Sequence, residues 1–308
     1  MVMNGERRDM DGLVNVLIST YNGEKYIAQQ IESIKSQTYP AVRIYVRDDG
    51  SSDHTLQILQ EYEKRGEIIL EKGENIGYGR SFLSLLRMAG EGDYWAFSDQ
   101  DDVWYPEKIQ WSVDWLSRQN PKRPALFGNA YELTSEDLGT VLGTNMPPGY
   151  RFDFRRSITD CLYQGFVMTM NRPLRSLMLR GEDQNLISHD WWGVMLAEEY
   201  GCSFFDGRIA AKHRRLDSSV SVMSLRNRFK WLRDTFITGN SSIKANAKEF
   251  ERVFGSRCRR RDARIVHWFT HDSYCLRDSL KKAFYPGRWR PSLSSELVIR
   301  FLMLCGRI

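Results

Sequence analysis

Residues 94–102 read YWAFSDQDD, an apolar run that ends in a group of carboxylates. The uninterrupted apolar and aromatic residues 94–97 predict a strand that is buried on both faces of a sheet. Asp99, Asp101 and Asp102 then place three negative charges within four residues. Carboxylates gathered at the end of a buried strand cost free energy unless a cation neutralises them, and hard oxygen ligands suit Mg²⁺ or Mn²⁺. The stretch therefore indicates a divalent metal site, with a solvated acidic turn as the alternative.

Two similar junctions precede this one in the chain. The apolar run 13–18 ends in the polar segment 19–23, STYNG. The alternating apolar residues 42–46 predict a second strand, which is followed by 48–53, DDGSSD. Turn formation and helix capping are the alternative explanation of both segments, because Ser, Asp, Asn and Gly favour turns in any protein.

Helices and strands alternate through this part of the chain. Apolar residues at helical spacing predict helices before Pro40, across 56–62 and across 82–89, and residues 68–70 predict a further short strand. This alternation indicates an α/β fold with a mainly parallel sheet flanked by helices. Ligands of such sheets bind beyond the carboxyl ends of the strands. We therefore expect the polar segments after the first, second and fourth strands to lie together at one edge.

The middle of the chain is less regular. Residues 125–129, 166–170 and 202–205 predict strands, and residues 190–200 predict a helix. The segment 139–151 is rich in Gly and Pro and predicts a loop.

Charge divides the chain into an acidic body and a basic end. Residues 1–224 hold 25 Lys and Arg against 32 Asp and Glu, whereas residues 225–308 hold 19 against 7. The basic end has apolar residues at helical spacing and several aromatic residues. A solvated cationic face on packed helices is one interpretation. Contact with an anionic membrane surface or with a polyprenyl-diphosphate-linked acceptor is another, and self-association of the helices is a third. No motif of a nucleic-acid-binding protein occurs, so we expect no nucleic acid partner.

Cysteine spacing and hydropathy indicate the compartment. The five cysteines are scattered and form no CxxC pair, which argues against a zinc site or a disulfide framework. Residues 1–12 lack the apolar core of a signal peptide. The apolar stretch 297–305 is interrupted by Arg300 and is too short to span a bilayer. We therefore expect a cytoplasmic protein, with peripheral contact at the inner face of the cell membrane as an open alternative.

The order of the junctions resembles the family 2 glycosyltransferases, which have the Rossmann-like GT-A fold. The matching segments are 16–23, VLISTYNG; 46–53, VRDDGSSD; 74–77, ENIG; and 97–102, FSDQDD. The likeness covers residues 13–220. Residues 98–104, SDQDDVW, are similar to the rhamnosyltransferase-type members that build bacterial surface polysaccharides.

The resemblance implies a domain division and a donor site. It implies a GT-A catalytic domain at 1–224, with a nucleotide-sugar half at 13–105 and an acceptor half at 106–224, followed by a helical basic region at 225–308. The residues implied to bind the nucleotide-sugar are Thr20, Tyr21, Asn22, Asp48, Asp49, Asn75, Arg80 and Asp99. The residues implied to bind the divalent cation, Mg²⁺ or Mn²⁺, are Asp99, Asp101, Asp102 and His213. A structural role is the alternative for His213, because the small-residue spacing that follows it in the family is not kept here.

The acceptor side is implied by two segments. Asp190, in the sequence HDWW at 189–192, matches the family's catalytic base, while His189 departs from the commoner acidic residue. Gly165 resembles a glycine of an acceptor-side strand, where the missing side chain admits a sugar. The residues implied to face the acceptor are Gly165, His189, Trp191 and Trp192. Helix capping by Asp190 and burial of both tryptophans in the core are the alternatives.

The resemblance implies an inverting, metal-dependent sugar transfer from a nucleoside-diphosphate donor, with dTDP-rhamnose as the first candidate. The implied acceptor is a hydroxyl of a growing cell-surface polysaccharide or lipid-linked oligosaccharide. Alternatives are a UDP-sugar-dependent transferase of a hexose or N-acetylhexosamine, a nucleotidyltransferase, and a non-catalytic nucleotide-sugar-binding protein. The sequence disfavours a nucleotidyltransferase, because no Gly-rich phosphate loop with Lys or Arg follows the first strand.

Overall fold

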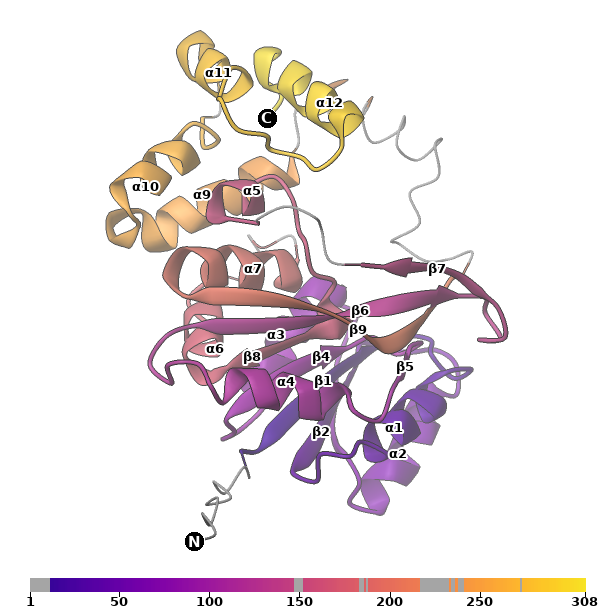
Figure 1. Ribbon diagram of the computed structural model, residues 1–308. Coiled ribbons are helices and arrows are strands. Elements are labelled where there is room, and N and C mark those ends of the chain that lie inside the picture. The colour runs from indigo at the N-terminus through magenta and orange to yellow at the C-terminus, as the bar shows by residue number, and fades with distance from the viewer. Residues whose placement is uncertain are drawn as a thin grey trace, which may run out of the picture.

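A computed structural model describes residues 12–146, 152–182, 186, 188–216, 233, 236–237, 241–271 and 273–308. Within these residues the largest element is a nine-stranded mixed sheet with helices on both faces (Figure 1). The order of its strands is β3-β2-β1-β4-β8-β6-β9-β5, and β7 pairs with β6. The strands are β1 Val14–Thr20, β2 Val42–Asp48, β3 Ile69–Lys72, β4 Tyr94–Ser98, β5 Val103–Trp104, β6 Ala125–Thr134, β7 Val141–Asn145, β8 Met168–Asn171 and β9 Cys202–Arg214.

The four strands nearest the N-terminus run parallel to one another. β1 pairs with β2 and β4, and β2 pairs with β3. Antiparallel pairing begins where β8 joins β4. The expected α/β fold with a mainly parallel sheet is therefore confirmed.

Helices cover the sheet on two faces. They are α1 Ile27–Lys35, α2 Thr55–Lys64, α3 Tyr78–Met88, α4 Lys108–Leu116, α5 Phe154–Ser157, α6 Arg172–Met178, α7 His189–Tyr200, α9 Ser242–Phe254, α10 Arg260–His267, α11 Leu276–Ala283 and α12 Leu293–Leu304, with short 3₁₀ turns η1 Gly165–Val167 and η2 Gly255–Arg257. Val16 and Ile18 pack with α1, α2 and α4, whereas Leu17 packs with α3, α6 and α7. All three side chains are fully buried, which explains the uninterrupted apolar run of β1.

Three expectations for the middle of the chain are corrected. β7 lies within 139–151, which was expected to be a loop, and it pairs antiparallel with β6. β9 continues to Arg214 because it pairs along the length of β6, so tertiary pairing and not the local pattern sets where it ends. The strand expected at 166–170 begins only at Met168, since residues 165–167 form the turn η1.

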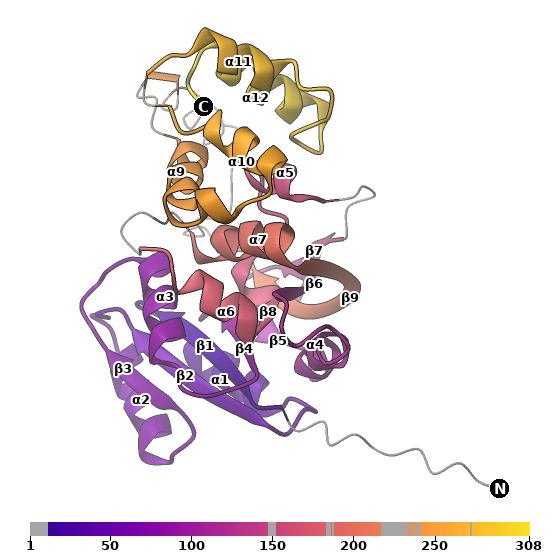
Figure 2. The same ribbon diagram turned by 90° about the vertical axis from the view of Figure 1, so that its left-hand side faces the viewer.

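The C-terminal helices pack on the face of the sheet that carries α7. Figure 2 shows α9 and α10 next to α7, and α11 and α12 at the far end of the molecule. The contact is apolar: the ring of Trp192 lies 6.2 Å from Phe250 and 5.9 Å from Phe254. Residues 225–232 of the expected helical region lie outside the described residues.

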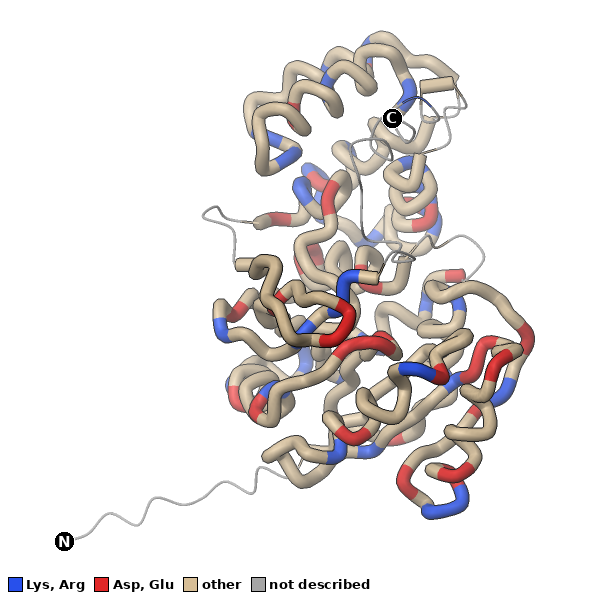
Figure 3. Tube along the Cα trace, turned by 90° about the vertical axis from the view of Figure 1, so that its right-hand side faces the viewer, with Lys and Arg blue, Asp and Glu red and all other residues tan. Residues whose placement is uncertain are grey.

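The pairing register brings the carboxyl ends of the strands to one edge. Thr20 lies opposite Asp48, and Ile18 lies opposite Ser98. The N–H of Asp49 donates to the carbonyl of Thr20 at 2.8 Å. Figure 3 looks toward this edge, where several acidic stretches of the chain come close to one another. The three polar segments after β1, β2 and β4 therefore start side by side, as expected.

The junction between α7 and β9 leaves no room for a side chain at Gly201. A Cβ there would lie 1.8 Å from the carbonyl oxygen of Pro124. We expect Gly201→Ala to lower the free energy of unfolding by about 1–3 kcal/mol, the usual cost of overpacking. The loss should be at the upper end of this range, because the obstacle is backbone, which cannot rotate away as a side chain can. Thermal unfolding measures the change. Gly143→Ala is the control, because a Cβ at Gly143 meets nothing within 4 Å. Equal melting temperatures of the two variants would contradict the prediction.

Candidate active site

Gln100 ties the loop after β1 to the loop after β4. Its Oε1 accepts hydrogen bonds from the Thr20 hydroxyl at 2.6 Å and from the Tyr21 N–H at 2.9 Å. Its Nε2 donates to the carbonyl of Tyr21 at 3.2 Å. The Thr20 hydroxyl is thus engaged within the protein, while the Tyr21 ring remains about half exposed.

Asp48 and Asn22 are joined through the serines of the second polar segment. The buried Asp48 accepts hydrogen bonds from the hydroxyl and the N–H of Ser51. The same hydroxyl accepts from the N–H of Asn22 at 2.9 Å, and Asn22 Oδ1 accepts from the N–H of Ser52 at 2.8 Å. Asn22 has a positive φ of 50°, which Asn adopts more readily than most residues. The first two polar segments therefore form one hydrogen-bonded unit around Asp48.

Asp49 holds the start of α3. Its carboxylate accepts from the N–H groups of Ile76 and Gly77, the latter at 3.0 Å, and pairs with the buried Arg47 at 3.2 Å. The side chains of Asn75 and Arg80, near the start of this helix, are exposed. Asp49 therefore positions the helix that carries these residues.

An acidic cluster follows β4 and includes a histidine from β9. Burial, then the charges of Asp102 and Asp101, raise the pKa of Asp99 well above its usual value. Burial and Asp102 raise the pKa of Asp101 to about 6. His213 Nδ1 lies 2.7 Å from Asp102 Oδ1. Burial opposes its protonation, but the carboxylates, Asp102 above all, raise the pKa of His213 to about 9.

Arg214 and Lys108 also balance the cluster. Arg214 Nε donates to the carbonyl of Asp101 at 2.8 Å, and its guanidinium also contacts Gln29 and the carbonyl of Glu136. Lys108 is fully buried, and its Nζ lies 3.7 Å from the centre of the Trp104 ring. Burial lowers the pKa of Lys108 to about 7, although the negative charge of Asp102 acts in the opposite direction and raises it.

The donor set suits a divalent cation. Asp102 is fully buried, yet its Oδ2 has no hydrogen-bond partner, and a buried carboxylate oxygen normally has one. Mutual repulsion among the three carboxylates is relieved when a cation binds between them. His213 Nδ1 faces Asp102, so in this geometry the histidine is first a partner of that carboxylate. The residue types of the cluster therefore suit Mg²⁺ or Mn²⁺. Among the described residues, however, only the group of His271, Cys275 and Asp278 has three ligand atoms within 4.8 Å of one another, so Asp99, Asp101 and Asp102 are not drawn together around a cation in this structure.

Asp190 lies in the first turn of α7, half buried. Its Oδ1 accepts from the Ser188 hydroxyl and from the Trp191 N–H. Burial raises the pKa of Asp190 to about 6, while hydrogen bonds from the N–H groups of Trp191 and Gly165 act in the opposite direction and lower it. The charge of Asp190 raises the pKa of Asp99 in turn, so these two carboxylates interact. Tyr78, whose pKa is raised by burial and then by the charges of Asp190 and Asp99, lies close enough to both to interact with them.

The turn η1 connects the acidic cluster with Asp190. The ring of Phe166 stacks on His213 with centroids 4.7 Å apart. A Cβ at Gly165 would lie 2.4 Å from Nε2 of His189, the residue before Asp190. Gly165 is thus required by the packing of His189, and the expected role of admitting a sugar is not needed to explain it.

Three residues expected to face the acceptor contribute mainly to packing. His189 is buried between Phe82 and Phe97, and burial lowers its pKa to about 3, so the ring is neutral. Trp192 is fully buried, and its Nε1 donates to the carbonyl of Met178, so its expected contact with an acceptor is corrected. Trp191 is only partly buried, and its Nε1 donates to the carbonyl of Ser157.

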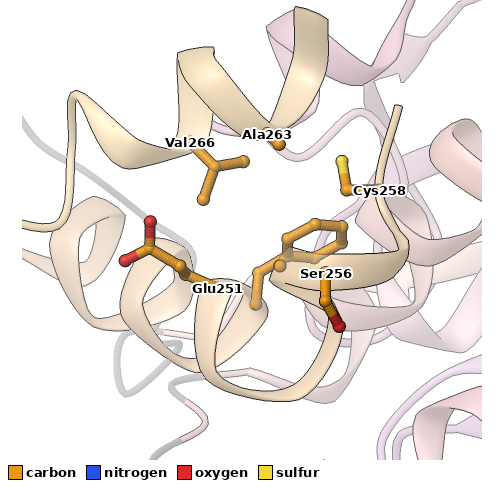
Figure 4. A pocket seen from close by; sticks show the side chains of 7 residues that line it. Glu251, Ser256, Cys258, Ala263 and Val266 are labelled. Carbon is orange, nitrogen blue, oxygen red and sulfur yellow. The ribbon is translucent and has the colours of Figure 1, made fainter. Parts of the chain in front are cut away.

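A cavity of about 280 Å³ lies elsewhere, between α9, η2 and α10 (Figure 4). Glu251 and Cys258 are among its lining residues, and Glu251 is already paired with His267 at 2.8 Å. None of the expected site residues lines this cavity.

The chain belongs to glycosyl transferase family 2, whose pattern matches residues 15–172. This is an inverting glycosyltransferase family. The dTDP-rhamnosyl transferase RfbG of Shigella flexneri is 36% identical over 109 residues, which are 33% of this chain and 38% of that protein. The UDP-Glc:alpha-D-GlcNAc-diphosphoundecaprenol beta-1,3-glucosyltransferase WfgD of Escherichia coli is 25% identical over 228 residues, 72% of this chain and 83% of that protein. The chain thus spans well under half of the first relative and most of the second.

A solved structure shows the same fold. TarS 1-349 of S. aureus, crystallised with UDP-GlcNAc, matches with a TM-score of 0.55 and 15% identity, covering 96% of this chain and 90% of that chain. The likeness confirms the GT-A-like fold over nearly the whole chain, the helical C-terminal region included.

The pair of Asp102 and His213 gives a prediction for the metal-free protein. Asp102→Asn should lower the pKa of His213 from about 9 by about 1–3, because the neighbouring negative charge that favours the imidazolium is lost. NMR titration of the histidine rings measures it, with His271, whose partner is Asp278, as the internal control. In the wild type, the pKa of His213 is higher in the folded protein than in the unfolded chain. The protonated ring therefore stabilises the fold fully below about pH 6.5, and this stabilisation is lost as the pH rises through about 9. A pKa that stays near 9 in the variant would contradict the assigned cause.

Proposed function

We propose that this chain transfers a sugar from a nucleoside-diphosphate donor to a hydroxyl group by a single displacement with inversion, with Asp190 as the catalytic base. The observation that carries the proposal is the placement of Asp190 at the start of α7. There it is half buried, separate from the acidic cluster, and still close enough to raise the pKa of Asp99. An inverting transfer needs such a carboxylate apart from the groups that hold the donor diphosphate.

The donor half of the site is proposed to lie at residues 13–105. In this proposal Asp48 holds the nucleobase by hydrogen bonding and the exposed ring of Tyr21 holds it by stacking. Thr20, Asn22 and Asp49 support these groups through the hydrogen bonds described above. Asn75 and Arg80 flank the nucleotide-sugar from the start of α3, while Asp99, Asp101 and Asp102 hold Mg²⁺ or Mn²⁺. When bound, such a cation neutralises the negative charge that builds on the leaving diphosphate.

Asp190 moves one proton in the proposed reaction. With a pKa of about 6, its carboxylate is largely ionised at neutral pH and can accept the proton of the acceptor hydroxyl. As the hydroxyl oxygen bonds to the anomeric carbon, the bond from that carbon to the diphosphate oxygen breaks, and the nucleoside diphosphate leaves. The Ser188 hydroxyl and the Trp191 N–H fix the carboxylate in place. Residues 106–224 make up the proposed acceptor half, where Trp191 is the half-buried aromatic beside the base.

The proposed donor is dTDP-rhamnose, and a UDP-sugar is the second candidate. The rhamnose assignment rests on the segment SDQDDVW and on the identity with RfbG, which is confined to a third of this chain. WfgD, named for a UDP-glucose donor and a diphosphoundecaprenol-linked acceptor, matches a longer part of the chain at lower identity. We propose a saccharide acceptor of a cell-surface polysaccharide, free or lipid-linked. The alternative of a non-catalytic sugar-nucleotide-binding protein is less favoured, because such a protein needs a donor pocket but no catalytic base such as the one proposed for Asp190.

Asp190→Asn should retain nucleotide binding and lose transfer by about 10²–10⁴-fold, because the amide cannot accept the hydroxyl proton. The wild-type kcat/KM should fall as the pH drops through about 6, since protonation removes the base. Nucleoside diphosphate release and calorimetric binding of the donor check both parts. Asp114→Asn is the matched control, because this carboxylate of α4 is bonded to Gln110, outside the site. Near-normal turnover in Asp190→Asn would remove the residue from this role.

A panel of UDP-, dTDP- and GDP-sugars, each with and without Mn²⁺ or Mg²⁺, should identify the donor class by thermal shift. A ligand at about 100 times its Kd stabilises the fold by about 2.7 kcal/mol, or about 5 °C in a chain of this size. We expect the largest shift with dTDP-rhamnose and the metal together. Asp99→Asn combined with Asp101→Asn should abolish the part of the shift that depends on metal. A larger shift with a UDP-sugar would replace the rhamnose assignment, and no shift with any donor would oppose the proposed function itself.

A further inference from the structure

An exposed apolar stripe runs along α11. Leu276, Leu280 and Phe284 follow one another at intervals of four residues, which places them on one face of the helix. Their exposed fractions are 57%, 41% and 72%. The opposite face is buried and carries Asp278 and Lys282, while the buried Ser279 and Ala283 lie along one flank of the stripe. The large apolar side chains of α11 therefore point outward, where a water-soluble helix normally places polar ones.

A second stripe runs along α12, which packs against α11. Leu293, Leu297, Phe301 and Leu304 are spaced as one helical face and are 64%, 69%, 54% and 38% exposed. The ring of Phe236, itself partly exposed, stacks on Phe301 with centroids 6.1 Å apart and extends the apolar surface. Figures 1 and 2 place α11 and α12 together at the end of the molecule farthest from β2. We call the exposed apolar side chains of these two helices the apolar tip.

The charges around the apolar tip are almost all positive. Residues 273–308, all of them described, contain seven Lys and Arg and two Asp and Glu. Both acidic side chains are buried: Asp278 pairs with His271 and Lys281, and Glu296 pairs with Arg300. The cations Arg277, beside the stripe of α11, and Arg288, between the two helices, are exposed. Within residues 273–308 the surface exposed to solvent is therefore apolar and cationic and has no exposed carboxylate side chain.

We propose that the apolar tip binds the surface of an anionic lipid bilayer. Amphipathic helices lie in the interface when large apolar side chains enter the acyl boundary and flanking cations meet anionic headgroups. The length of α12, 12 residues, corresponds to about 18 Å, which suits a helix lying in the interface. Among the described residues, none of the helices has the length and hydropathy required to cross a bilayer.

Charge favours a bilayer over a second copy of the chain as the occupant. A symmetric dimer would place the same face of both copies in contact, and with it the exposed arginines of both. Their repulsion would oppose the apolar contact, and no exposed carboxylate side chain of residues 273–308 is available to compensate it. Anionic headgroups supply the compensating charge together with an apolar layer.

Co-sedimentation with vesicles tests the proposal. The full chain should bind vesicles of phosphatidylglycerol and phosphatidylcholine in equal parts, bind pure phosphatidylcholine vesicles at least about tenfold less, and be released from the former by salt. Leu297→Ser with Phe301→Ser should weaken binding at least about tenfold. The matched control is Ile69→Ser with Leu142→Ser, which removes two side chains of similar exposure from β3 and β7 and should bind as the wild type. Leu276→Ser with Phe284→Ser repeats the test on α11 and guards against misfolding of one variant.

A second pair of double variants tests whether the exposed cations beside the apolar tip contribute to vesicle binding. Arg277→Gln with Arg288→Gln should reduce binding to the anionic vesicles, whereas Arg118→Gln with Lys122→Gln, two exposed cations after α4, should not. Binding should be unchanged in Asp190→Asn, so a failure of the catalytic assignment leaves this result intact. Two outcomes would overturn the proposal: equal binding by all apolar variants, or absence of binding of the full chain to the anionic vesicles. A dimer, seen by light scattering, that Leu297→Ser with Phe301→Ser dissociates would then identify a second copy as the occupant.

Discussion

Repulsion among the three carboxylates after β4 is the constraint to which the rest of the site responds. Parallel pairing of β4 with β1 fixes where this segment leaves the sheet. Burial makes the negative charges of Asp99, Asp101 and Asp102 costly. The pKa values of Asp99 and Asp101 are raised, and the Oδ2 atom of Asp102 has no hydrogen-bond partner. Two of the compensating groups, His213 and Arg214 on β9, come from a distant segment, whereas Lys108 on α4 follows the cluster by six residues. His213 reaches the cluster because β9 continues as far as Arg214, so the topology of the sheet determines the electrostatics of the cluster.

The turn η1 makes the donor and acceptor sides a single structure. Phe166 packs on the histidine of the acidic cluster, and the adjacent Gly165 packs on His189 and donates its N–H toward Asp190. Neither residue has a titratable side chain, yet both lie between the acidic cluster and Asp190, the proposed base. A neutral His189, wedged between aromatic rings, explains why an imidazole can precede the base where an acidic residue is commoner: it packs and carries no charge.

Local sequence patterns predicted the first four strands, because β1 and β4 are continuous apolar runs, β2 alternates apolar and polar residues, and β3 is a short apolar segment between two helical patterns. The same patterns singled out Asp48 and Asp99, since each follows a strand, whereas the role expected for Asp190 rests on the resemblance to the family, because an Asp at a helix start is otherwise ordinary capping. They missed Gln100, whose contacts to Thr20 and Tyr21 depend on strand order, and Lys108, which reads as an ordinary helix residue. They also misplaced the end of β9 and the strand β7, because pairing with β6 overrides local Gly and Pro content. Contacts between distant segments carry no local signature.

The basic end of the chain packs through an apolar core on α7, the helix that begins with Asp190 in its first turn. The Trp192 ring of α7 packs between Phe250 and Phe254 of α9, and the apolar core continues without a break from α7 to α12. Polar contacts add to it: Asp160 pairs with Arg290 at 2.6 Å. A close-packed interior transmits displacement, so the tip formed by α11 and α12 and the first turn of α7 keep one orientation relative to each other. If Asp190 is the base as proposed, a surface on which that tip rests also sets how the first turn of α7 is oriented toward an acceptor.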